Sequence, residues 1–368
     1  MRDLRAAQTD VQRGVSTNRA SAGDRHWSRW EEYTAELGLD PLLQAVTDKI
    51  PVIQVFLYRV RQGYASASGH QVRSRTAEEY LRSVAQTYLS LGAPDPRLDF
   101  GGHVDFRITR MLKAYAKEDP PPNRVKPVPV PVIRHILVIA HAGADPQQHC
   151  VADMICLAFF FLLRPGEYVI NPSESTPFEL KDVQLFLGQT RLDIATATET
   201  AIMSATFASL TFDKQKNGVR GEVIGHGASG NPLLCPVRAM GRRVLHLRAH
   251  HAPLPTPLAH WYNADNSVDK VRPAMVTDTI RLAVRFLGSS LGFLPTDVTA
   301  RCLRDSGANA LLCAGVDTDV IRLIGRWRSD EMLRFLHTQV SPLLRGFSQR
   351  ILTGGTFTLI PNQEVPTY

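Results

Sequence analysis

Apolar residues recur with helical spacing through the first third of the chain. The segments with apolar positions three and four apart are 27–37, 41–61, 75–91 and 103–117. This spacing predicts amphipathic helices. Thr76 followed by Glu79 is typical of a capping box at the start of a helix. The pattern therefore predicts an all-helical domain over residues 21–118, preceded by a flexible tail at residues 1–20.

A run of prolines interrupts this pattern. Residues 119–131 (DPPPNRVKPVPVP) hold six prolines. Proline lacks a backbone N–H and disfavours helix in the residue before it. These residues are therefore predicted to form an extended, fairly stiff linker between two domains.

After the linker, helical and alternating patterns are mixed. Helical spacing occupies 132–141 and 145–163 and returns from residue 236 onward, whereas alternation occupies 183–186, 190–194 and 209–212. Turn residues in Lys214-Gln215-Lys216-Asn217-Gly218-Val219 predict the tip of a β-hairpin. The chain is therefore predicted to be mainly α with a small β-sheet (α+β), with a second domain over 132–353 and a tail at 354–368.

The net charge indicates the kind of partner, and the cysteines argue against disulfide-bonded and zinc-binding classes of protein. Lys and Arg number 42 against 35 Asp and Glu, which gives a net charge of +7 and a pI near 9.3. This balance suits a polyanionic partner. The five cysteines form no CxxC pair, so neither a disulfide framework nor a zinc site is expected. A reducing compartment, nucleus or cytoplasm, is predicted.

The sequence offers no candidate for a membrane anchor or a secretory signal. Its longest apolar run, 154–163, is about half the length that a spanning helix needs, and it ends at Arg164. Charged residues are spread through residues 1–14, where a secretory signal would be apolar. No membrane partner is expected.

Three separated stretches carry candidate chemistry. They are Leu163-Arg164-Pro165-Gly166-Glu167, the hairpin with Lys214 and Lys216, and residues 299–337 (TARCLRDSGANALLCAGVDTDVIRLIGRWRSDEMLRFLH). In their order and spacing they resemble the catalytic domain of tyrosine recombinases, the phage integrase family. The last stretch is especially similar to versions carried by eukaryotic mobile elements, and the resemblance covers roughly residues 126–349. It implies a helical N-terminal DNA-clamp domain, an integrase-like catalytic domain, double-stranded DNA as partner, and no cofactor, metal or small-molecule substrate.

The resemblance also implies a reaction. Such enzymes attack a DNA phosphodiester with a tyrosine, form a 3′-phosphotyrosyl link and expel a 5′-hydroxyl. The transition state gathers negative charge on the nonbridging phosphate oxygens, which guanidinium groups stabilise through paired hydrogen bonds. Arg164 and Arg304 match those two positions. An alternative for Arg164 is a plain ion pair with Glu167 at a helix end.

Further family positions fall on basic residues. Lys216 matches the hairpin lysine that protonates the leaving 5′-oxygen, and Lys214 is the alternative candidate. If neither has this role, both are solvated lysines in a polar turn. Arg301 stands three residues before Arg304, where many members have histidine. Helical spacing puts both arginines on one face, where they would grip a single phosphate. Arg301 is otherwise a DNA backbone contact or a surface charge.

The motif Gly325-Arg326-Trp327 falls where the family has a histidine or tryptophan that supports the phosphate. The indole N–H of Trp327 is one candidate donor, and the alternative is a tryptophan packed in the core. Arg326 is the alternative hydrogen-bond donor to the phosphate. Arg326 and Arg328, together with Lys214, are predicted DNA contacts.

The family's nucleophilic tyrosine aligns with Phe335. Phenylalanine lacks the hydroxyl that attacks phosphorus, and electrostatic stabilisation cannot replace a missing nucleophile. The sequence therefore predicts a DNA-binding protein associated with DNA recombination and integration but deficient in strand cleavage. The alternative is an active site-specific recombinase that uses Tyr368 or a tyrosine supplied in trans. His337 and Ser329 match no family role.

Assembly follows from the resemblance alone. Family members form tetramers on paired DNA sites by exchanging C-terminal helices, and residues 340–352 are the candidate segment here. A homo-oligomer on DNA is therefore expected.

Overall fold

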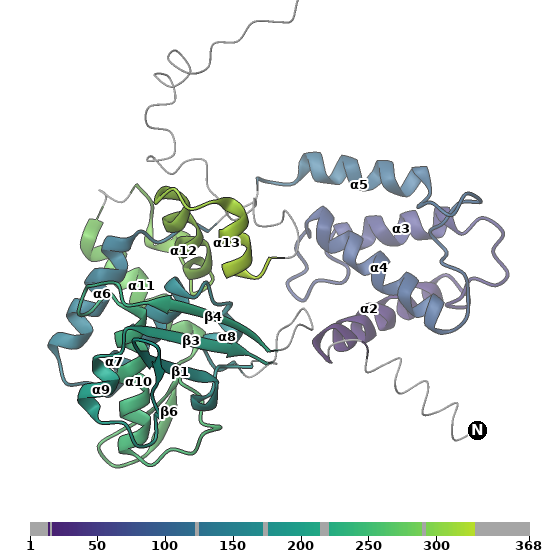
Figure 1. Ribbon diagram of the computed structural model, residues 1–368. Coiled ribbons are helices and arrows are strands. Elements are labelled where there is room, and N and C mark those ends of the chain that lie inside the picture. The colour runs from purple at the N-terminus through teal and green to yellow at the C-terminus, as the bar shows by residue number, and fades with distance from the viewer. Residues whose placement is uncertain are drawn as a thin grey trace, which may run out of the picture. The chain divides into compact units, whose positions relative to one another are not determined.

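The computed structural model describes residues 14, 17–121, 125–171, 176–213, 221–288 and 292–327 (Figure 1). The chain divides into two compact units, Met1–Asn123 and Arg124–Tyr368. This division falls inside the proline-rich segment 119–131. Each unit encloses a hydrophobic core of its own. In the described ranges no helix combines the length and the apolar character needed to cross a membrane.

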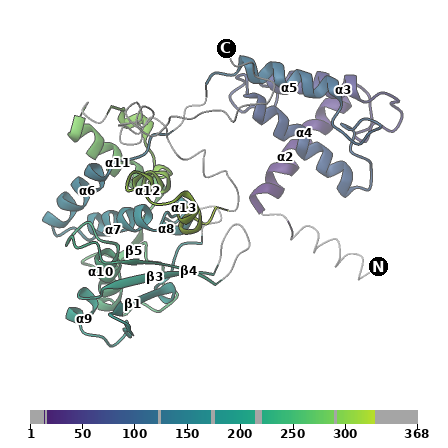
Figure 2. The same cartoon turned by 45° about the horizontal axis from the view of Figure 1, so that its top comes forward.

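The first unit is helical. Its helices are α2 (Thr17–Glu36), α3 (Ile50–Arg61), α4 (Ser74–Ser90) and α5 (Phe106–Glu118) (Figure 2). Buried aromatic rings fill its core, with Trp30 edge-on to Phe56 at a centroid distance of 5.0 Å. Trp30 Nε1 and the Tyr88 hydroxyl both donate to the Pro41 carbonyl, at 2.8 and 2.7 Å. Their polar atoms are therefore satisfied inside an apolar core.

The helix predicted over 41–61 begins only at Ile50. The side chain of Asp40 accepts the backbone N–H groups of Leu42 and Gln44, at 3.0 and 2.9 Å. Leu43 adopts a left-handed conformation with φ 51°. Local side-chain hydrogen bonds thus replace the first helical turns with tight turns, a competition typical of aspartate.

The capping box predicted at Thr76 and Glu79 is also wrong. Helix α4 begins at Ser74, so Thr76 lies inside it, and the N-cap residue Arg73 makes no side-chain capping bond. Asp119, at the end of α5, instead accepts the backbone N–H of Ser74 at 2.9 Å. The cap comes from a residue distant in sequence, which no local pattern reveals.

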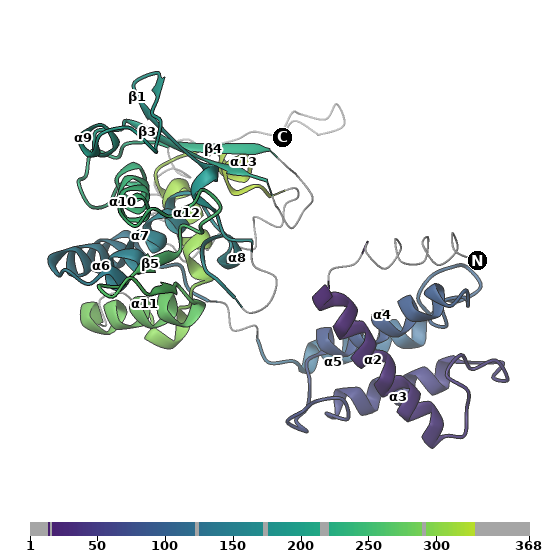
Figure 3. The ribbon, with the colours of Figure 1, turned by 90° about the horizontal axis from the view of Figure 1, so that it is seen from below.

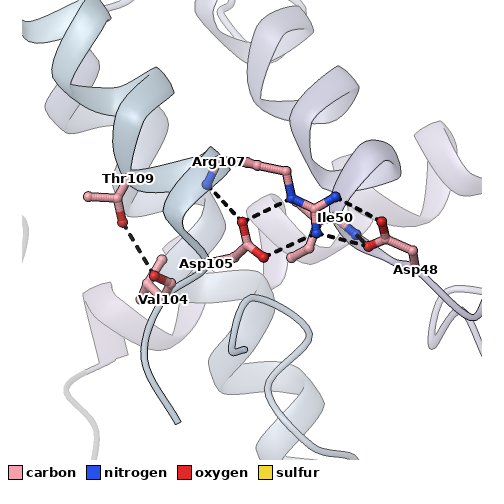
Figure 4. A network of polar contacts seen from close by, with 6 residues as sticks. All are labelled: Asp48, Ile50, Val104, Asp105, Arg107 and Thr109. Atoms are coloured by element: carbon pink, nitrogen blue, oxygen red, sulfur yellow. Dashed lines mark hydrogen bonds and ion pairs between the residues drawn. The ribbon is translucent and has the colours of Figure 1, made fainter. Parts of the chain in front are cut away.

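A polar network joins the starts of α3 and α5 (Figure 4). Arg107 donates from Nη1 to Asp48 at 2.8 Å and from Nε to Asp105 at 3.0 Å. Asp105 also caps α5 by accepting the Arg107 backbone N–H at 2.7 Å. Hydrogen bonds from Arg107 lower the pKa of both carboxyls. The network fixes where the α4–α5 connection enters α5.

The second unit contains an antiparallel sheet with strand order β2-β1-β3-β4. Its strands are β1 (Val183–Leu187), β2 (Thr190–Arg191), β3 (Phe207–Phe212) and β4 (Glu222–Gly227). A second, two-stranded sheet pairs β5 (His260–Tyr262) with β6 (Val268–Lys270). The helices of both units, together with these two small sheets, confirm the predicted α+β class.

The sheet of the second unit lies along one side of its helices (Figure 3). These helices are α6 (Val130–Ala142), α7 (Pro146–Phe160), α8 (Pro165–Tyr168), α9 (Glu199–Met203), α10 (Pro236–Ala249), α11 (Pro273–Leu287), α12 (Cys302–Cys313) and α13 (Thr318–Gly325), with 3₁₀ turns at Leu180–Asp182 and Pro295–Asp297. Helix α10 packs against β1, β3 and β4. Helix α7 is buried from Cys150 to Phe159 and contacts α6, α10, α11 and α12. It is apolar on every side, as a central helix must be.

His246 on α10 makes folding stability depend on pH. Its Nε2 accepts the Tyr262 backbone N–H at 3.0 Å, and burial followed by the nearby Arg243 charge lowers the pKa of His246 to about 4. Between pH ~6.5 and ~4 the unfolded chain binds a proton that the folded chain rejects. We therefore expect this group to remove about 1 kcal/mol of stability over that window, a value reduced for its partial exposure.

The measurement is urea unfolding of the wild type and of His246→Gln at pH 7.5, 6 and 4.5. Glutamine keeps a hydrogen-bond acceptor but does not titrate. The variant should show a shallower loss of stability below pH 6.5. Equal pH dependence in both proteins would contradict this assignment.

Candidate active site

Arg164 stands at the turn between α7 and α8. Leu162 has a left-handed backbone (φ 50°), and Arg164 is the N-cap of α8. Glu167 accepts the Arg164 backbone N–H at 2.8 Å and its Nη1 at 3.0 Å. The Arg164 side chain is nevertheless 28% exposed. The ion pair considered as an alternative is therefore present, and it leaves part of the guanidinium open to solvent.

Arg304 lies on α12 and is buried. Its Nη2 donates to the Gly325 carbonyl, and its guanidinium lies 4.2 Å from the centroid of the Trp327 ring. Within the described residues its Nε has no acceptor. Burial, followed by the positive charges of Arg164 and Arg326, lowers the pKa of Arg304 to about 9. The three guanidinium groups are thus close enough to repel one another.

Arg326 ends α13 in a left-handed conformation with φ 58°. Its side chain is 1% exposed and donates to Glu167 Oε2 at 2.9 Å. It also donates to the carbonyls of Phe161 and Leu162, at 3.2 and 3.3 Å. The guanidinium packs over the Phe212 ring at 3.8 Å. The sequence predicts Arg326 as a DNA contact; in the structure its Nη1 and Nη2 face acceptors inside the protein, while its buried Nε has no acceptor among the described residues.

Trp327 follows Arg326 and covers Arg304. The Trp327 ring occupies the space in which a Cβ on Gly325 would lie, so the missing side chain of Gly325 lets the indole fold back. The Trp327 backbone N–H donates to the Arg322 carbonyl at 3.0 Å. Stacking against Arg304 restricts that guanidinium to one orientation.

Two carboxyl groups accompany these arginines. Glu167 is buried and shared between Arg164 and Arg326. Burial raises the pKa of the adjacent Asp305 to about 7, although Arg304 opposes this shift. Asp305 is therefore only partly charged near neutrality. The arginine cluster, defined as Arg164, Arg304 and Arg326 with Glu167, keeps an excess of positive charge.

Arg301 is not brought into this cluster. It is the N-cap of α12 and is exposed, whereas Arg304 points inward. Among the described residues, the charges that lower the pKa of Arg304 come from Arg164 and Arg326. The predicted grip of Arg301 and Arg304 on one phosphate stays a prediction, with Arg301 on the solvent side.

Several predicted site residues lie outside the described residues: Lys214, Lys216, Arg328, Phe335 and Tyr368. The strands that flank the hairpin lysines are described, and they pair Phe212 with Glu222. Because the Phe212 ring contacts Arg326, the end of β3 that precedes the hairpin lysines lies next to the arginine cluster. No sequence pattern pointed to Phe212 or to the sharing of Glu167 with Arg326, since both depend on tertiary contacts.

Gly307 lets the helix that carries Arg304 pack closely against the end of α7. A Cβ at Gly307 would overlap the Phe159 carbonyl oxygen and the Leu162 side chain. Gly307→Ala is therefore expected to lower the free energy of unfolding by about 3 kcal/mol, since backbone atoms cannot yield cheaply. Urea unfolding measures this. Gly23→Ala on α2 has open space around its Cβ and should instead stabilise by about 0.5 kcal/mol; equal effects of both changes would contradict the prediction.

Comparisons with known proteins show which solved structures share this fold. No protein-family model matches the sequence, and no curated protein matches it. Among solved structures, the integrase of transposon Tn1549 in complex with a circular intermediate DNA is similar, with 15% identity and a TM-score of 0.53. An arginine-to-lysine variant of that integrase with another circular intermediate DNA gives 14% identity and a TM-score of 0.52. The same integrase with transposon right end DNA gives 13% identity and a TM-score of 0.50. Each alignment covers 95% of this chain and 98% of the other. The chain therefore has the integrase fold.

Proposed function

We propose that this chain is a DNA-binding protein of the tyrosine recombinase type, associated with DNA recombination and integration, whose arginine cluster holds a backbone phosphate of duplex DNA. The observation that carries this is that Arg164 and Arg326 share the single carboxylate of Glu167, while Arg304 donates to the carbonyl of Gly325 beside Arg326 and its buried Nε has no acceptor among the described residues. Packing like charges together is costly unless an anion is bound. The solved complexes of the Tn1549 integrase with DNA support the same partner.

In this proposal each residue has a distinct part. Arg164 and Arg304 donate to the nonbridging oxygens of one phosphate. Trp327 holds the Arg304 guanidinium over its ring, 4.2 Å from the centroid. Lys216, or Lys214 in its place, approaches from the hairpin, and Arg301 and Arg328 contact neighbouring phosphates. The chain works as a nuclear or cytoplasmic homo-oligomer, a tetramer on paired sites, and derives from a eukaryotic mobile element.

Strand cleavage is absent in this proposal because Phe335 supplies no hydroxyl. The cluster then binds and orients a phosphate without reaction. The alternative is an active recombinase whose nucleophile is Tyr368 or a tyrosine from another subunit.

Two assays on the wild-type chain test the proposal. Filter binding to duplex DNA at low and moderate salt should show affinity that falls steeply with salt. A suicide DNA substrate, which traps the covalent intermediate, should give no protein–DNA adduct. An adduct that disappears in Tyr368→Phe would establish the alternative, and failure to retain duplex DNA at low salt would overturn the proposal.

A further inference from the structure

One carboxylate in the arginine cluster is divided between two arginines. Glu167 Oε1 accepts Arg164 Nη1 at 3.0 Å, and Oε2 accepts Arg326 Nη2 at 2.9 Å. Oε2 also accepts the Arg164 backbone N–H at 2.8 Å. The carboxylate is therefore anchored at both oxygens, and only one side-chain nitrogen of Arg164 is bound to it.

The two arginines differ in what they leave available. Arg326 is 1% exposed and donates from Nη1 and Nη2 to Glu167 and to the carbonyls of Phe161 and Leu162. Its Nε has no acceptor among the described residues, but the guanidinium is covered by the Phe212 ring. Arg164 is 28% exposed. An arginine and a carboxylate left alone favour a two-pronged pair, which would occupy the fork that a phosphate needs. Arg326, together with the Arg164 backbone N–H, opposes that arrangement by holding Oε2.

We propose that Arg326 is a positioning residue that does not touch DNA: by anchoring Glu167, it keeps this carboxylate from neutralising Arg164 and leaves the Arg164 fork for phosphate. The inference rests on the proposed phosphate binding and adds the part played by a buried residue. The cost of the left-handed backbone at a non-glycine residue is offset by these contacts.

Three variants test this by filter binding to mixed-sequence duplex DNA: Arg326→Met, Glu167→Gln, and the two combined. Arg326→Met should lower affinity about tenfold, because Glu167 Oε2 then keeps only the Arg164 backbone N–H and its charge is left to pair with the Arg164 guanidinium, which removes one charge-assisted contact to phosphate. Combining it with Glu167→Gln should return affinity to within about threefold of wild type, because the competing charge is gone. Thermal unfolding should show that the double variant stays less stable than wild type, since the contacts to Phe161 and Leu162 are not restored.

Arg285→Met is the matched control, because it removes one exposed positive charge from α11. It should change affinity less than Arg326→Met. If Arg326 bound phosphate itself, or acted only through stability, the folded double variant would stay weak, and the proposal would be overturned. If Arg326→Met does not fold, the affinity of the folded double variant is compared with that of wild type. Affinity within about threefold of wild type supports the proposal, and weak binding overturns it.

The control for the proposed function is Arg164→Ala combined with Arg304→Ala. If the Arg164→Ala/Arg304→Ala variant loses affinity for DNA but Glu167→Gln does not rescue Arg326→Met, only the positioning role of Arg326 is refuted, and phosphate binding by the cluster stands. No loss in the pair would refute phosphate binding by the cluster.

Discussion

Replacing Arg164 and Arg304 together by alanine is expected to lower affinity for duplex DNA about 100-fold. Each guanidinium contributes charge-assisted hydrogen bonds to phosphate worth about 1.5 kcal/mol or more. Burial and the positive charges of Arg164 and Arg326 lower the pKa of Arg304, while Glu167 and Asp305 act in the opposite direction. A bound phosphate would offset the remaining repulsion. Removing both groups therefore removes the part of the cluster that favours an anion.

The salt dependence makes this prediction specific. If both arginines hold a single phosphate, the slope of log affinity against log salt should fall by about 1, since one phosphate contact is lost. A fall of about 2 would mean that they hold separate phosphates. Filter binding over a salt series measures both the slope and the affinity.

Matched variants control for net charge and for folding. Arg272→Ala combined with Arg285→Ala removes two exposed charges at α11 and should weaken binding far less. Arg304→Lys keeps the charge but loses the planar fork, and should fall between wild type and alanine. If the Arg164/Arg304 pair bound DNA as well as the α11 pair, the cluster would have no special role.

The fold class could be predicted because the hydrophobic pattern changes period along the chain. Alternation at 183–186 and 209–212 lies within β1 and β3, and continuous apolar positions mark α7. Helix ends were less predictable. Asp40 replaces the first turns of the helix expected over 41–61, and Asp119 caps α4 from a distant position. Side-chain hydrogen bonds of this kind compete with periodicity and leave no trace in it.

The candidate site was predictable only in part. The order of its motifs singled out Arg164 and Arg304, and in the structure burial and then the charge of Arg164 lower the pKa of Arg304. Spacing also placed Arg301 beside Arg304; Arg301 is the exposed N-cap residue of α12, and a shared grip of both arginines on one phosphate stays a prediction. The motif Gly325-Arg326-Trp327 predicted Arg326 as a DNA contact, and motif spacing gives no sign that its side chain is buried. Its burial depends on Glu167 and Phe212, which approach from other elements.

Phe335→Tyr is expected to convert the chain from one that forms no covalent link with DNA into one that does. The substitution adds only the hydroxyl that the family's reaction requires. A phosphate already held by Arg164 and Arg304 would then meet a nucleophile in a site that stabilises the developing charge. Phe335 lies outside the described residues, so this expectation rests on the aligned motif.

A suicide DNA substrate and denaturing electrophoresis measure the outcome: an adduct with Phe335→Tyr and none with wild type. Adding Arg304→Ala to Phe335→Tyr should reduce adduct formation about 100-fold or more, because removing one transition-state donor costs about that much in other enzymes. Adding Tyr368→Phe should leave the adduct unchanged. If Phe335→Tyr binds DNA normally yet forms no adduct, the missing hydroxyl is not the only defect, and the cluster has lost the geometry for cleavage as well as the nucleophile.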